Sequence, residues 1–306
     1  EFGMRALRAY PSLVAEVEAA CGFEVEFRPE GILKVAFTDE QAGELRARLA
    51  WQQRLGEPIA WLDAALCREL EPRLSLRVAG GVFSHAEGSV SNQLLALGLE
   101  RAGRALGVDV QERTPVTGFT RSAGRVTHVR SGGRSFECDV VVLAAGARSG
   151  QLARRLGVAL PVEPVRGQMI ALGGMRPPIR RIVWGPDGYL VPRANGLVFA
   201  GATVERVGFR RRTTRAGIGR LRAMARRLVP QLGAATTPFA WAGLRPGTGD
   251  GLPYIGPMAR WANVIAATGH YRNGILLGPL TGKLVAAGVA SGDWTEAAAF
   301  SPERGA

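Results

Sequence analysis

The residues best suited to chemistry in this chain are gathered between positions 241 and 275. Three motifs follow one another there, at 241–248 (WAGLRPGT), 251–256 (GLPYIG) and 269–275 (GHYRNGI). Arg245 and Arg272 stand among glycines, and Gly274 opens an apolar helix. A glycine-rich turn that leads into a helix presents free backbone N–H groups and the positive end of the helix dipole. The pattern predicts a site for an anion or an electron-rich ring, with arginines that could hold a carboxylate through paired hydrogen bonds.

Further segments extend this pattern along the chain, at 164–168 (PVRGQ), 188–193 (GYLVPR) and 201–203 (GAT). Together, the motifs and their spacing resemble the glycine oxidase branch of the D-amino acid oxidase family of flavoenzymes, over nearly the whole chain. The resemblance implies an enzyme in which FAD oxidises the Cα–N bond of glycine, sarcosine or a D-amino acid. The imine then yields an oxo acid and ammonia, and oxygen becomes hydrogen peroxide. It also implies a link to the thiazole half of thiamine, whose synthesis uses the imine of glycine.

The resemblance assigns three residues to the substrate. Arg245 would pair with the substrate carboxylate and fix Cα over the flavin, with room for a ligand beside Gly243 and Gly247. Tyr189 would hydrogen-bond the same carboxylate, and a tyrosine that only fills the core of a strand is the alternative. Arg272 would lie beside the flavin and contact the substrate or only the cofactor.

The cofactor contacts implied by the resemblance are made largely by the main chain. N–H groups at the start of the last helix would meet the flavin carbonyl edge, and the helix dipole would stabilise the reduced, anionic flavin. FAD would then carry out the oxidation itself, so we expect no catalytic triad and no metal site. The predicted cofactor-binding residues are Val116, Ala144, Ala145, Gly146, Gly243, His270, Tyr271, Arg272, Asn273, Gly274, Ile275 and Leu276.

Two departures from the family pattern bear on which amine fits. The turn at 185–188 (GPDG), before Tyr189, contributes no histidine near the substrate. Val204 follows the GAT motif, where relatives can place a larger side chain in the pocket. Glycine, sarcosine, a D-amino acid and an imino acid such as D-proline therefore stay open as the preferred substrate.

A dinucleotide-binding unit is missing from the sequence. Enzymes of this kind begin with a strand, a Gly-x-Gly-x-x-Gly turn, a helix and a second strand that ends in an acidic residue. The glycine pairs at 80–81 and 132–133 lie in strand and hairpin contexts, and neither fits. We therefore expect that roughly the first fifty residues, one βαβ unit, are lacking. Two alternatives follow: a non-catalytic remnant, or one half of an assembly whose partner supplies the unit.

Composition indicates a globular α/β protein with a basic surface. The 306 residues include 41 glycines and 46% hydrophobic residues, which fits two domains with many tight turns. The net charge of +13 admits nucleic-acid binding, as in an amine oxidase module of an RNA-modifying protein. We favour a solvated arginine-rich surface, because the only dense run, at 210–212, has no interleaved aromatic residues for base stacking.

The cysteines and the apolar runs bear on the compartment. Cys21, Cys67 and Cys138 are scattered, which excludes a disulfide framework or a zinc site and predicts buried thiols in a reducing cytoplasm. The most apolar run, at 275–290, contains Lys283 and three glycines, so we expect no membrane span. The partners are then a small amino acid and oxygen, and the resemblance also implies a homo-oligomer.

Hydrophobic periodicity and cap residues place the elements. We expect a fully buried parallel strand at 140–146 (VVVLAAG), with its end facing a ligand. The predicted helices cover 1–21 with a break near Pro11, 39–55 capped by Asp39, 63–70 capped by Asp63, 91–106, 218–228 and 274–290. The other predicted strands cover 25–27, 32–37, 80–84, 108–111, 116–120, 126–130, 161–172, 182–184, 189–192, 197–202, 238–244, 254–255 and 264–267.

The predicted fold class is α/β, with two interleaved domains. An incomplete Rossmann-like parallel sheet would bind FAD and would comprise residues 1–20, 86–156 and 240–306. A mostly antiparallel sheet would bind the substrate and would comprise residues 21–85 and 157–239.

Overall fold

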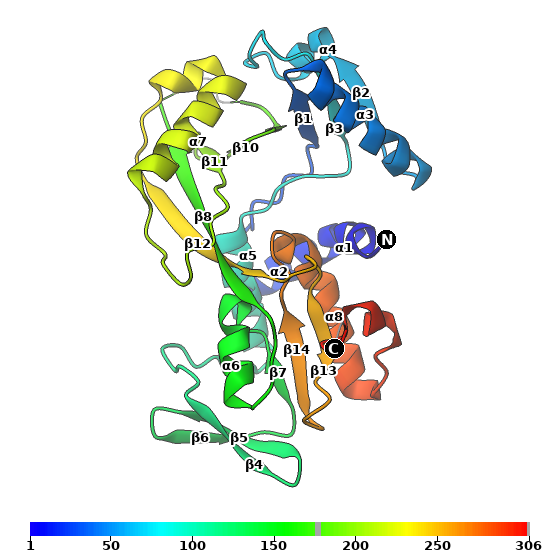
Figure 1. Cartoon of the computed structure of the whole chain (residues 1–306), viewed down its shortest axis with the longest axis vertical. Coiled ribbons are helices and arrows are strands. Elements are labelled where there is room, and N and C mark those ends of the chain that lie inside the picture. The colour runs from blue at the N-terminus through cyan, green and yellow to red at the C-terminus, as the bar shows by residue number, and fades with distance from the viewer. Residues whose placement is uncertain (175–178, 305–306) are drawn as a thin grey trace.

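The computed structural model describes residues 1–174 and 179–304, and its upper part in Figure 1 is built on one large sheet. The strands of this sheet are β1 (Ile32–Ala36), β2 (Ile59–Asp63), β3 (Gly80–Ser84), β8 (Glu163–Leu172), β9 (Ile182–Gly185), β10 (Gly188–Pro192), β11 (Val198–Gly201) and β12 (Ala240–Gly247). Their order is β12-β8-β11-β10-β9-β1-β3-β2. All neighbours are antiparallel except β1 and β9, which are parallel.

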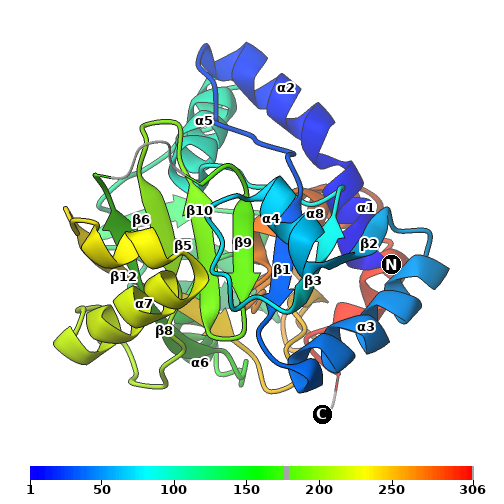
Figure 2. The ribbon, with the colours of Figure 1, turned by 90° about the horizontal axis from the view of Figure 1, so that it is seen from above.

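One face of the large sheet is covered by helix α7 (Arg215–Leu228), which lies across the strands in Figure 2. The helix begins at Thr214, whose hydroxyl accepts a hydrogen bond from Gly217 N at 3.1 Å. Its apolar stripe, including Leu221 and Leu228, packs against Ile170 and Leu190 in the main core. Strand neighbours of these core residues point to the opposite face, because side chains alternate along a strand. That opposite face carries the candidate site.

The lower part of Figure 1 holds a three-stranded sheet with the order β13-β14-β7. Its strands are β7 (Val141–Leu143), β13 (Tyr254–Pro257) and β14 (Val264–Thr268), and β14 runs parallel to β7. The prediction of a fully buried strand at 140–146 is wrong in two respects. The strand covers three residues, and Val142 is 40% exposed because its side chain lines an open cavity, whereas Val141 and Leu143 point into the core.

A separate antiparallel meander lies at the bottom of Figure 1. It consists of β4 (Gly118–Ser122), β5 (Arg125–Ser131) and β6 (Arg134–Glu137). The predicted strands at 25–27 and 108–111 do not form. The first segment makes only a single bridge nearby, between Arg28 and Ser89, and an apolar run without a continuous partner strand gains no ladder of hydrogen bonds.

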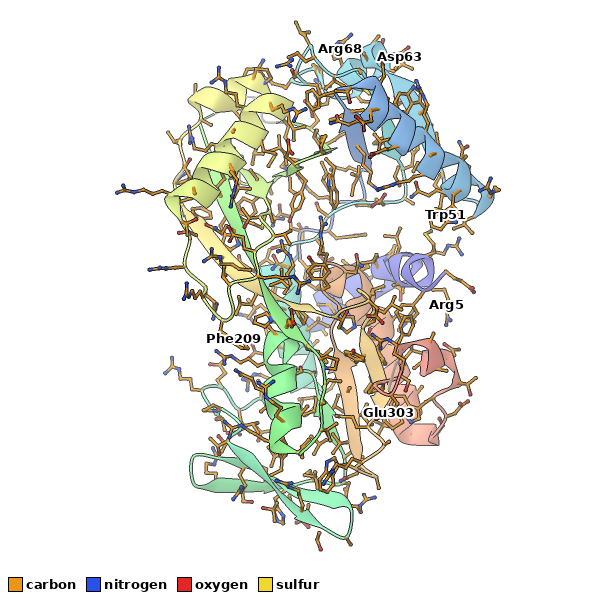
Figure 3. All side chains as sticks on the ribbon, in the orientation of Figure 1. Arg5, Trp51, Asp63, Arg68, Phe209 and Glu303 are labelled. Carbon is orange, nitrogen blue, oxygen red and sulfur yellow. The ribbon has the colours of Figure 1, made fainter. Side chains whose placement is uncertain are left out.

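The helices largely follow the cap signals in the sequence. Asp63 caps α4 as predicted and accepts from Ala65 N and Leu66 N at 2.9 Å; it lies at the top of Figure 3. At α3 the cap is Thr38 rather than Asp39, because the Thr38 hydroxyl accepts from Gln41 N at 3.3 Å. The helices are α1 (Phe2–Arg8), α2 (Tyr10–Cys21), α3 (Asp39–Arg54), α4 (Ala64–Leu70), α5 (Asn92–Ala105), α6 (Ser149–Arg155) and α8 (Gly274–Ser291), with short 3₁₀ segments η1 (Gly146–Arg148), η2 (Pro230–Ala234) and η3 (Thr295–Phe300).

The proposed division into two domains meets one difficulty in the topology. β12 pairs with β8 along its whole length, so a boundary at residue 240 passes through the large sheet. The proposed ranges also include residues 175–178 and 305–306, which lie outside the described residues. We keep the division as a proposal, with β12 shared between the two parts.

Helix α8 is long and apolar enough to cross a membrane by length and composition, with a mean hydropathy of 1.4. Length and hydropathy are weak evidence that a single helix spans a membrane, because core helices can have the same length and hydropathy. Part of α8 packs on α1 through Ala6, Leu277 and Leu280, and another face lines a cavity. Only 22% of the helix is buried by these contacts and the rest of the described chain.

A buried carboxylate joins the end of α4 to the segment before β9 and supports a stability prediction. Glu71 is fully buried, and its Oε2 accepts from Arg180 N at 2.6 Å and from Arg181 N at 3.2 Å. Replacing Glu71 with alanine leaves these N–H groups without an acceptor, and should lower the free energy of unfolding by about 3 kcal/mol. Urea denaturation would measure this change. Glu69→Ala on the exposed side of α4 is the control, with an expected change within about 0.5 kcal/mol; equal effects of the two substitutions would contradict the prediction.

Candidate functional site

The strand register brings the predicted substrate residues to one face of the large sheet. Trp241, Met169, Gly201, Tyr189, Trp184 and Lys34 form one row of cross-strand partners. Directly paired residues point to the same face, and residues two and four positions along a strand do so as well. Arg245 is four residues beyond Trp241 on β12, so it shares this face with Tyr189. The face lies opposite to the one that α7 covers.

Arg245 lies within a group of polar side chains. Its Nη1 donates to the Thr203 carbonyl oxygen at 3.0 Å. Burial lowers the pKa of Arg245, and the positive charge of Arg272 lowers it further, whereas Tyr189 and Tyr271 act in the opposite direction. Such mutual influence places these side chains beside one another, and the Tyr189 hydroxyl lies 4.0 Å from Met169 Sδ on the same face of the sheet. A desolvated, still positive guanidinium with a phenol next to it suits a carboxylate.

Gly167 provides the floor on which the Arg245 guanidinium rests. A Cβ atom at this position would lie closer than 3.0 Å to three atoms of the guanidinium group. Gly167 is on β8 and pairs with Gly243 on β12, two residues before Arg245. The absence of a side chain at Gly167 therefore allows Arg245 to lie flat on the sheet.

Trp184 is a member of the site that sequence reasoning missed. Its ring lies 5.2 Å from the Tyr189 ring, and the Arg272 Cζ atom lies 5.8 Å from its centroid. Lys34 Nζ approaches the same ring at 6.0 Å and pairs with Glu87 at 2.9 Å. The short turn between β9 and β10 is a sequence signal from which Trp184 could have been predicted. A hairpin at this turn places residues 184 and 189 opposite each other.

The turn before α8 connects the substrate face to the lower sheet. Tyr271 N donates to the Pro246 carbonyl at 3.0 Å, which ties the turn to β12 one residue after Arg245. Asn273 is the N-cap residue of α8 and makes no side-chain cap hydrogen bond. The first N–H groups of the helix therefore remain available to an electron-rich partner. Arg272 is exposed at this turn and is within reach of the Trp184 ring.

A mostly apolar cavity of about 740 Å³ lies between α8 and the ends of β7 and β14. Three of the predicted cofactor residues line it: Ala144, His270 and Gly274. Its other lining residues are Val142, Ala267, Gly278, Thr281, Gly282, Val285, Ala286, Val289 and Ala290. The volume and the apolar lining suit a planar ring system, and the N-terminus of α8 lies at this cavity.

The remaining predicted cofactor residues do not line this cavity. Ala145 and Gly146 follow Ala144 into η1, where the Gly146 carbonyl accepts from Thr268. Val116 packs beside the Phe119 cluster, and Leu276 packs against α1. Ile275 is exposed, and its carbonyl accepts a hydrogen bond from the Tyr10 hydroxyl. Their roles toward a cofactor stay predictions.

His270 is largely buried between the turn and α8. Its Nε2 lies 2.9 Å from the Thr281 hydroxyl. Burial lowers the pKa of His270 to about 4, so the ring is neutral at neutral pH. The neutral ring adds no positive charge to the cavity. Its Nε2 atom forms one hydrogen bond with the Thr281 hydroxyl, as donor or as acceptor according to the tautomer.

The shifted pKa of His270 predicts an acid-dependent loss of stability. The pKa is about 4 in the folded protein and near 6.5 in the unfolded chain, so the unfolded chain binds more protons between these values. Stability should therefore fall as the pH drops from about 6.5 to 4. His270→Gln should remove about 2 kcal/mol of this fall, as measured by urea denaturation at pH 7 and pH 4.5. His85→Gln, at an exposed position, is the control, and an unchanged pH dependence in His270→Gln would contradict the assignment.

Across residues 1–174 and 179–304, no group of three or more histidine, cysteine, aspartate or glutamate side chains could hold a metal ion. The cysteines of the described chain are unpaired, and only Cys67 is buried, so the expectation of three buried thiols is wrong for Cys21 and Cys138.

These features define a class of protein. A family model described as FAD dependent oxidoreductase matches residues 2–287, and the chain belongs to this family of enzymes. Glycine oxidase from Geobacillus kaustophilus is 36% identical over 279 residues, which is 90% of this chain and 74% of that protein. The bifunctional protein ThiO/ThiG from Synechocystis sp. is 37% identical and covers 90% of this chain and 40% of its own length.

The fold is also found among solved structures. The crystal structure of glycine oxidase from Geobacillus kaustophilus matches with a TM-score of 0.94 and 32% identity, over 99% of this chain and 82% of that chain. The predicted mixed α/β fold and the resemblance to glycine oxidases are confirmed by these matches.

Proposed function

We propose that this chain catalyses the FAD-dependent oxidation of glycine or another small amino acid, with sarcosine and D-amino acids as the alternatives. The products are the imine or its oxo acid, ammonia and hydrogen peroxide. We place the activity in the supply of the glycine imine for the thiazole half of thiamine, and in the cytoplasm. Relatives named glycine oxidase and bifunctional ThiO/ThiG support this assignment.

The observation that carries the proposal is the meeting of Arg245 and Tyr189 beside the turn that begins α8. The two side chains come from strands that are not neighbours in the sheet, β12 and β10. Arg245 would hold the substrate carboxylate with two hydrogen bonds, and Tyr189 would donate a third. Two anchors on one carboxylate set the direction of Cα as well as the affinity.

The residues that would hold FAD are those of the α8 cavity. Ala144, His270 and Gly274 line it, and the first N–H groups of α8 would meet the electron-rich edge of the flavin. FAD supplies the two-electron acceptor when it is bound. The chain's own residues then need only bind and orient an amino acid whose amine is neutral. Tyr271, held to Pro246, keeps the flavin side and the carboxylate side in register.

An absorbance experiment tests the proposal. The purified protein is mixed with FAD, desalted, and then given glycine without oxygen. A flavin band that is retained and then bleaches would support the oxidase. Glycinamide is the matched control, because it keeps the amine and lacks the carboxylate that Arg245 would bind; equal bleaching by glycinamide would count against the role of Arg245.

One observation favours a second candidate, half of a hetero-assembly. β7 is an edge strand whose apolar Val142 is exposed, and such an edge can pair with a strand from another chain. A protein that emerges colourless from desalting would favour this candidate or a non-catalytic remnant. Salt-dependent binding of RNA would instead favour a role in RNA modification.

A further inference from the structure

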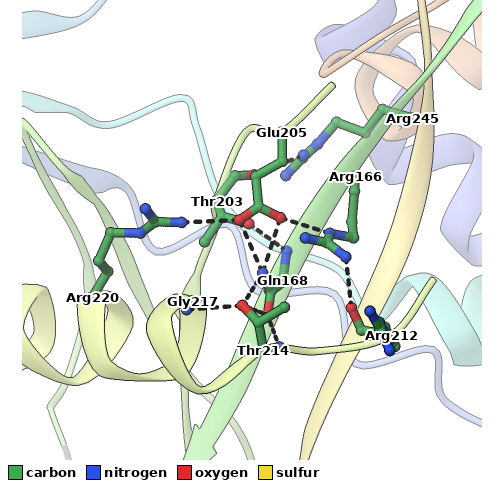
Figure 4. Close-up of polar contacts among 9 residues, drawn as sticks. All are labelled: Arg166, Gln168, Thr203, Glu205, Arg212, Thr214, Gly217, Arg220 and Arg245. Carbon is green, nitrogen blue, oxygen red and sulfur yellow. Dashed lines mark hydrogen bonds and ion pairs between the residues drawn. The ribbon is translucent and has the colours of Figure 1, made fainter. Parts of the chain in front are cut away.

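A buried polar network lies next to Arg245 (Figure 4). It contains Arg166 and Gln168 from β8, and Thr203 and Glu205 from the segment that follows β11. Gln168 is fully buried and Arg166 is 5% exposed. Buried polar groups of this kind fix a single arrangement when all their partners are present.

Gln168 and Thr203 connect this network to Arg245. Gln168 N donates to the Thr203 hydroxyl at 2.9 Å, and Thr203 N donates to the Gln168 carbonyl at 3.2 Å. The carbonyl of Thr203 accepts from Arg245 Nη1 at 3.0 Å. The position of one carbonyl oxygen therefore sets the direction of the guanidinium plane.

The side chain of Gln168 is held in one orientation. Its Oε1 accepts from Thr214 N at 2.7 Å, and its Nε2 donates to both carboxylate oxygens of Glu205, at 2.9 and 3.0 Å. Gly217 leaves just enough space, because a Cβ there would lie closer than 3.0 Å to the amide. Because Thr214 N is a donor and the Glu205 carboxylate is an acceptor, the Gln168 oxygen must face Thr214 and the Gln168 nitrogen must face Glu205.

Glu205 is the charged centre of the network. Its Oε2 accepts from Arg166 Nε at 2.6 Å, and its Oε1 accepts from Arg220 at 2.9 Å. Burial raises the pKa of Glu205, but the hydrogen bonds from Gln168 and Arg166 and the charges of Arg166 and Arg220 outweigh it, and the pKa lies below its usual value. Glu205 is thus a carboxylate at neutral pH. Arg166 also donates to the Arg212 carbonyl at 2.9 Å, which holds the loop closed over the network.

We propose that Glu205 is a positioning residue for the amino acid substrate, which fixes the direction of Arg245 through Gln168 and Thr203. The proposal rests on the proposed function, in which Arg245 binds the substrate carboxylate. Two-pronged binding requires the guanidinium and carboxylate planes to align. A small rotation of Arg245 would weaken substrate binding without altering the flavin side of the site.

The test is the Glu205→Gln substitution in the FAD-loaded protein. The amide keeps the shape of the side chain, but its NH₂ group would face a donor of Gln168 or of an arginine. We expect KM for glycine to rise about tenfold while kcat stays within about twofold. The dissociation constant of acetate, followed by the flavin spectrum, should rise in parallel. Glu205→Asp should recover part of the loss.

Glu163→Gln is the matched control. Glu163 lies on β8, as Gln168 does, and it forms an exposed ion pair with Arg206, the residue after Glu205. Within the described part of the chain its side chain makes no hydrogen bond to Gln168, so KM and the acetate dissociation constant should not change. If Glu205→Gln does not fold, Thr203→Val serves instead, because it removes the hydroxyl that Gln168 N contacts and keeps the carbonyl.

The outcomes separate this proposal from the proposed function. If Glu205→Gln lowers only the melting temperature and leaves KM and acetate binding unchanged, Glu205 is structural and the proposal is overturned. If Arg245→Ala raises KM while neither Glu205→Gln nor Thr203→Val does, the positioning role fails and the proposed function stands. If Arg245→Ala itself leaves KM unchanged, the proposed function fails as well.

Discussion

Replacing Arg245 with alanine should lower kcat/KM for glycine about a thousandfold, or about 4 kcal/mol. The guanidinium is partly desolvated, as the burial that lowers its pKa indicates. An ion pair in such surroundings contributes far more binding free energy than one on the surface. Without Arg245, the orientation of the substrate Cα is also no longer fixed.

Steady-state kinetics with glycine would measure this loss. Arg245→Lys should recover only part of the activity, because an ammonium keeps the charge but not the planar pair of donors. Arg206→Ala is the control, since Arg206 is an exposed arginine in an ion pair with Glu163. A loss of less than about tenfold in Arg245→Ala would show that the carboxylate is bound elsewhere.

Gly167→Ala should lower kcat/KM for glycine about a hundredfold while the protein stays folded. The added methyl group would occupy the space of the Arg245 guanidinium, and the flexible end of Arg245 is what must move. The backbone and the core packing need not change, so the melting temperature should stay within a few degrees. Displacement of a positioning group by about 1 Å is enough for a loss of this size.

Gly219→Ala is the matched control for this substitution. Gly219 lies on the exposed side of α7 and has open space where its Cβ would be. An alanine there should stabilise the helix slightly and leave kcat/KM unchanged. Activity near the wild-type level in Gly167→Ala would mean that Arg245 binds substrate from another position than the one seen on Gly167.

Local signals predicted most of the elements. Asp63 caps α4, the break near Pro11 separates α1 from α2, and the last helix begins at Gly274 as expected. These features depend on residues within one turn of each other, so a single sequence contains them. The incorrect predictions concern strands, whose formation depends on pairing partners far along the chain. The run at 140–146 forms a strand of only three residues, because β14 is its only neighbour among the described residues.

The residues of the candidate site also fall into two groups, those that could be predicted from local sequence and those that could not. Glycine-rich motifs identified Arg245, Tyr189 and Arg272 and suggested the helix N-terminus at Gly274, because turn chemistry and charge are visible in the sequence. Trp184 was missed, although the hairpin that places it beside Tyr189 is short. Gly167 and Glu205 were given no role, because each acts through a residue far away in the chain, Arg245 for the one and Gln168 for the other.

The family, the mixed α/β fold and the residue types available for chemistry could all be predicted from the amino-acid sequence. The folded structure was needed to show that Arg245 lies flat on Gly167, that Arg245 donates to the Thr203 carbonyl, and that the half-buried Glu205 carboxylate bonds to Gln168 behind them. The physical reason is that cap and turn preferences are properties of neighbouring residues, whereas the direction of a side chain is set by all the atoms packed against it. Those atoms come here from β8, the segment that follows β11, β12 and α7.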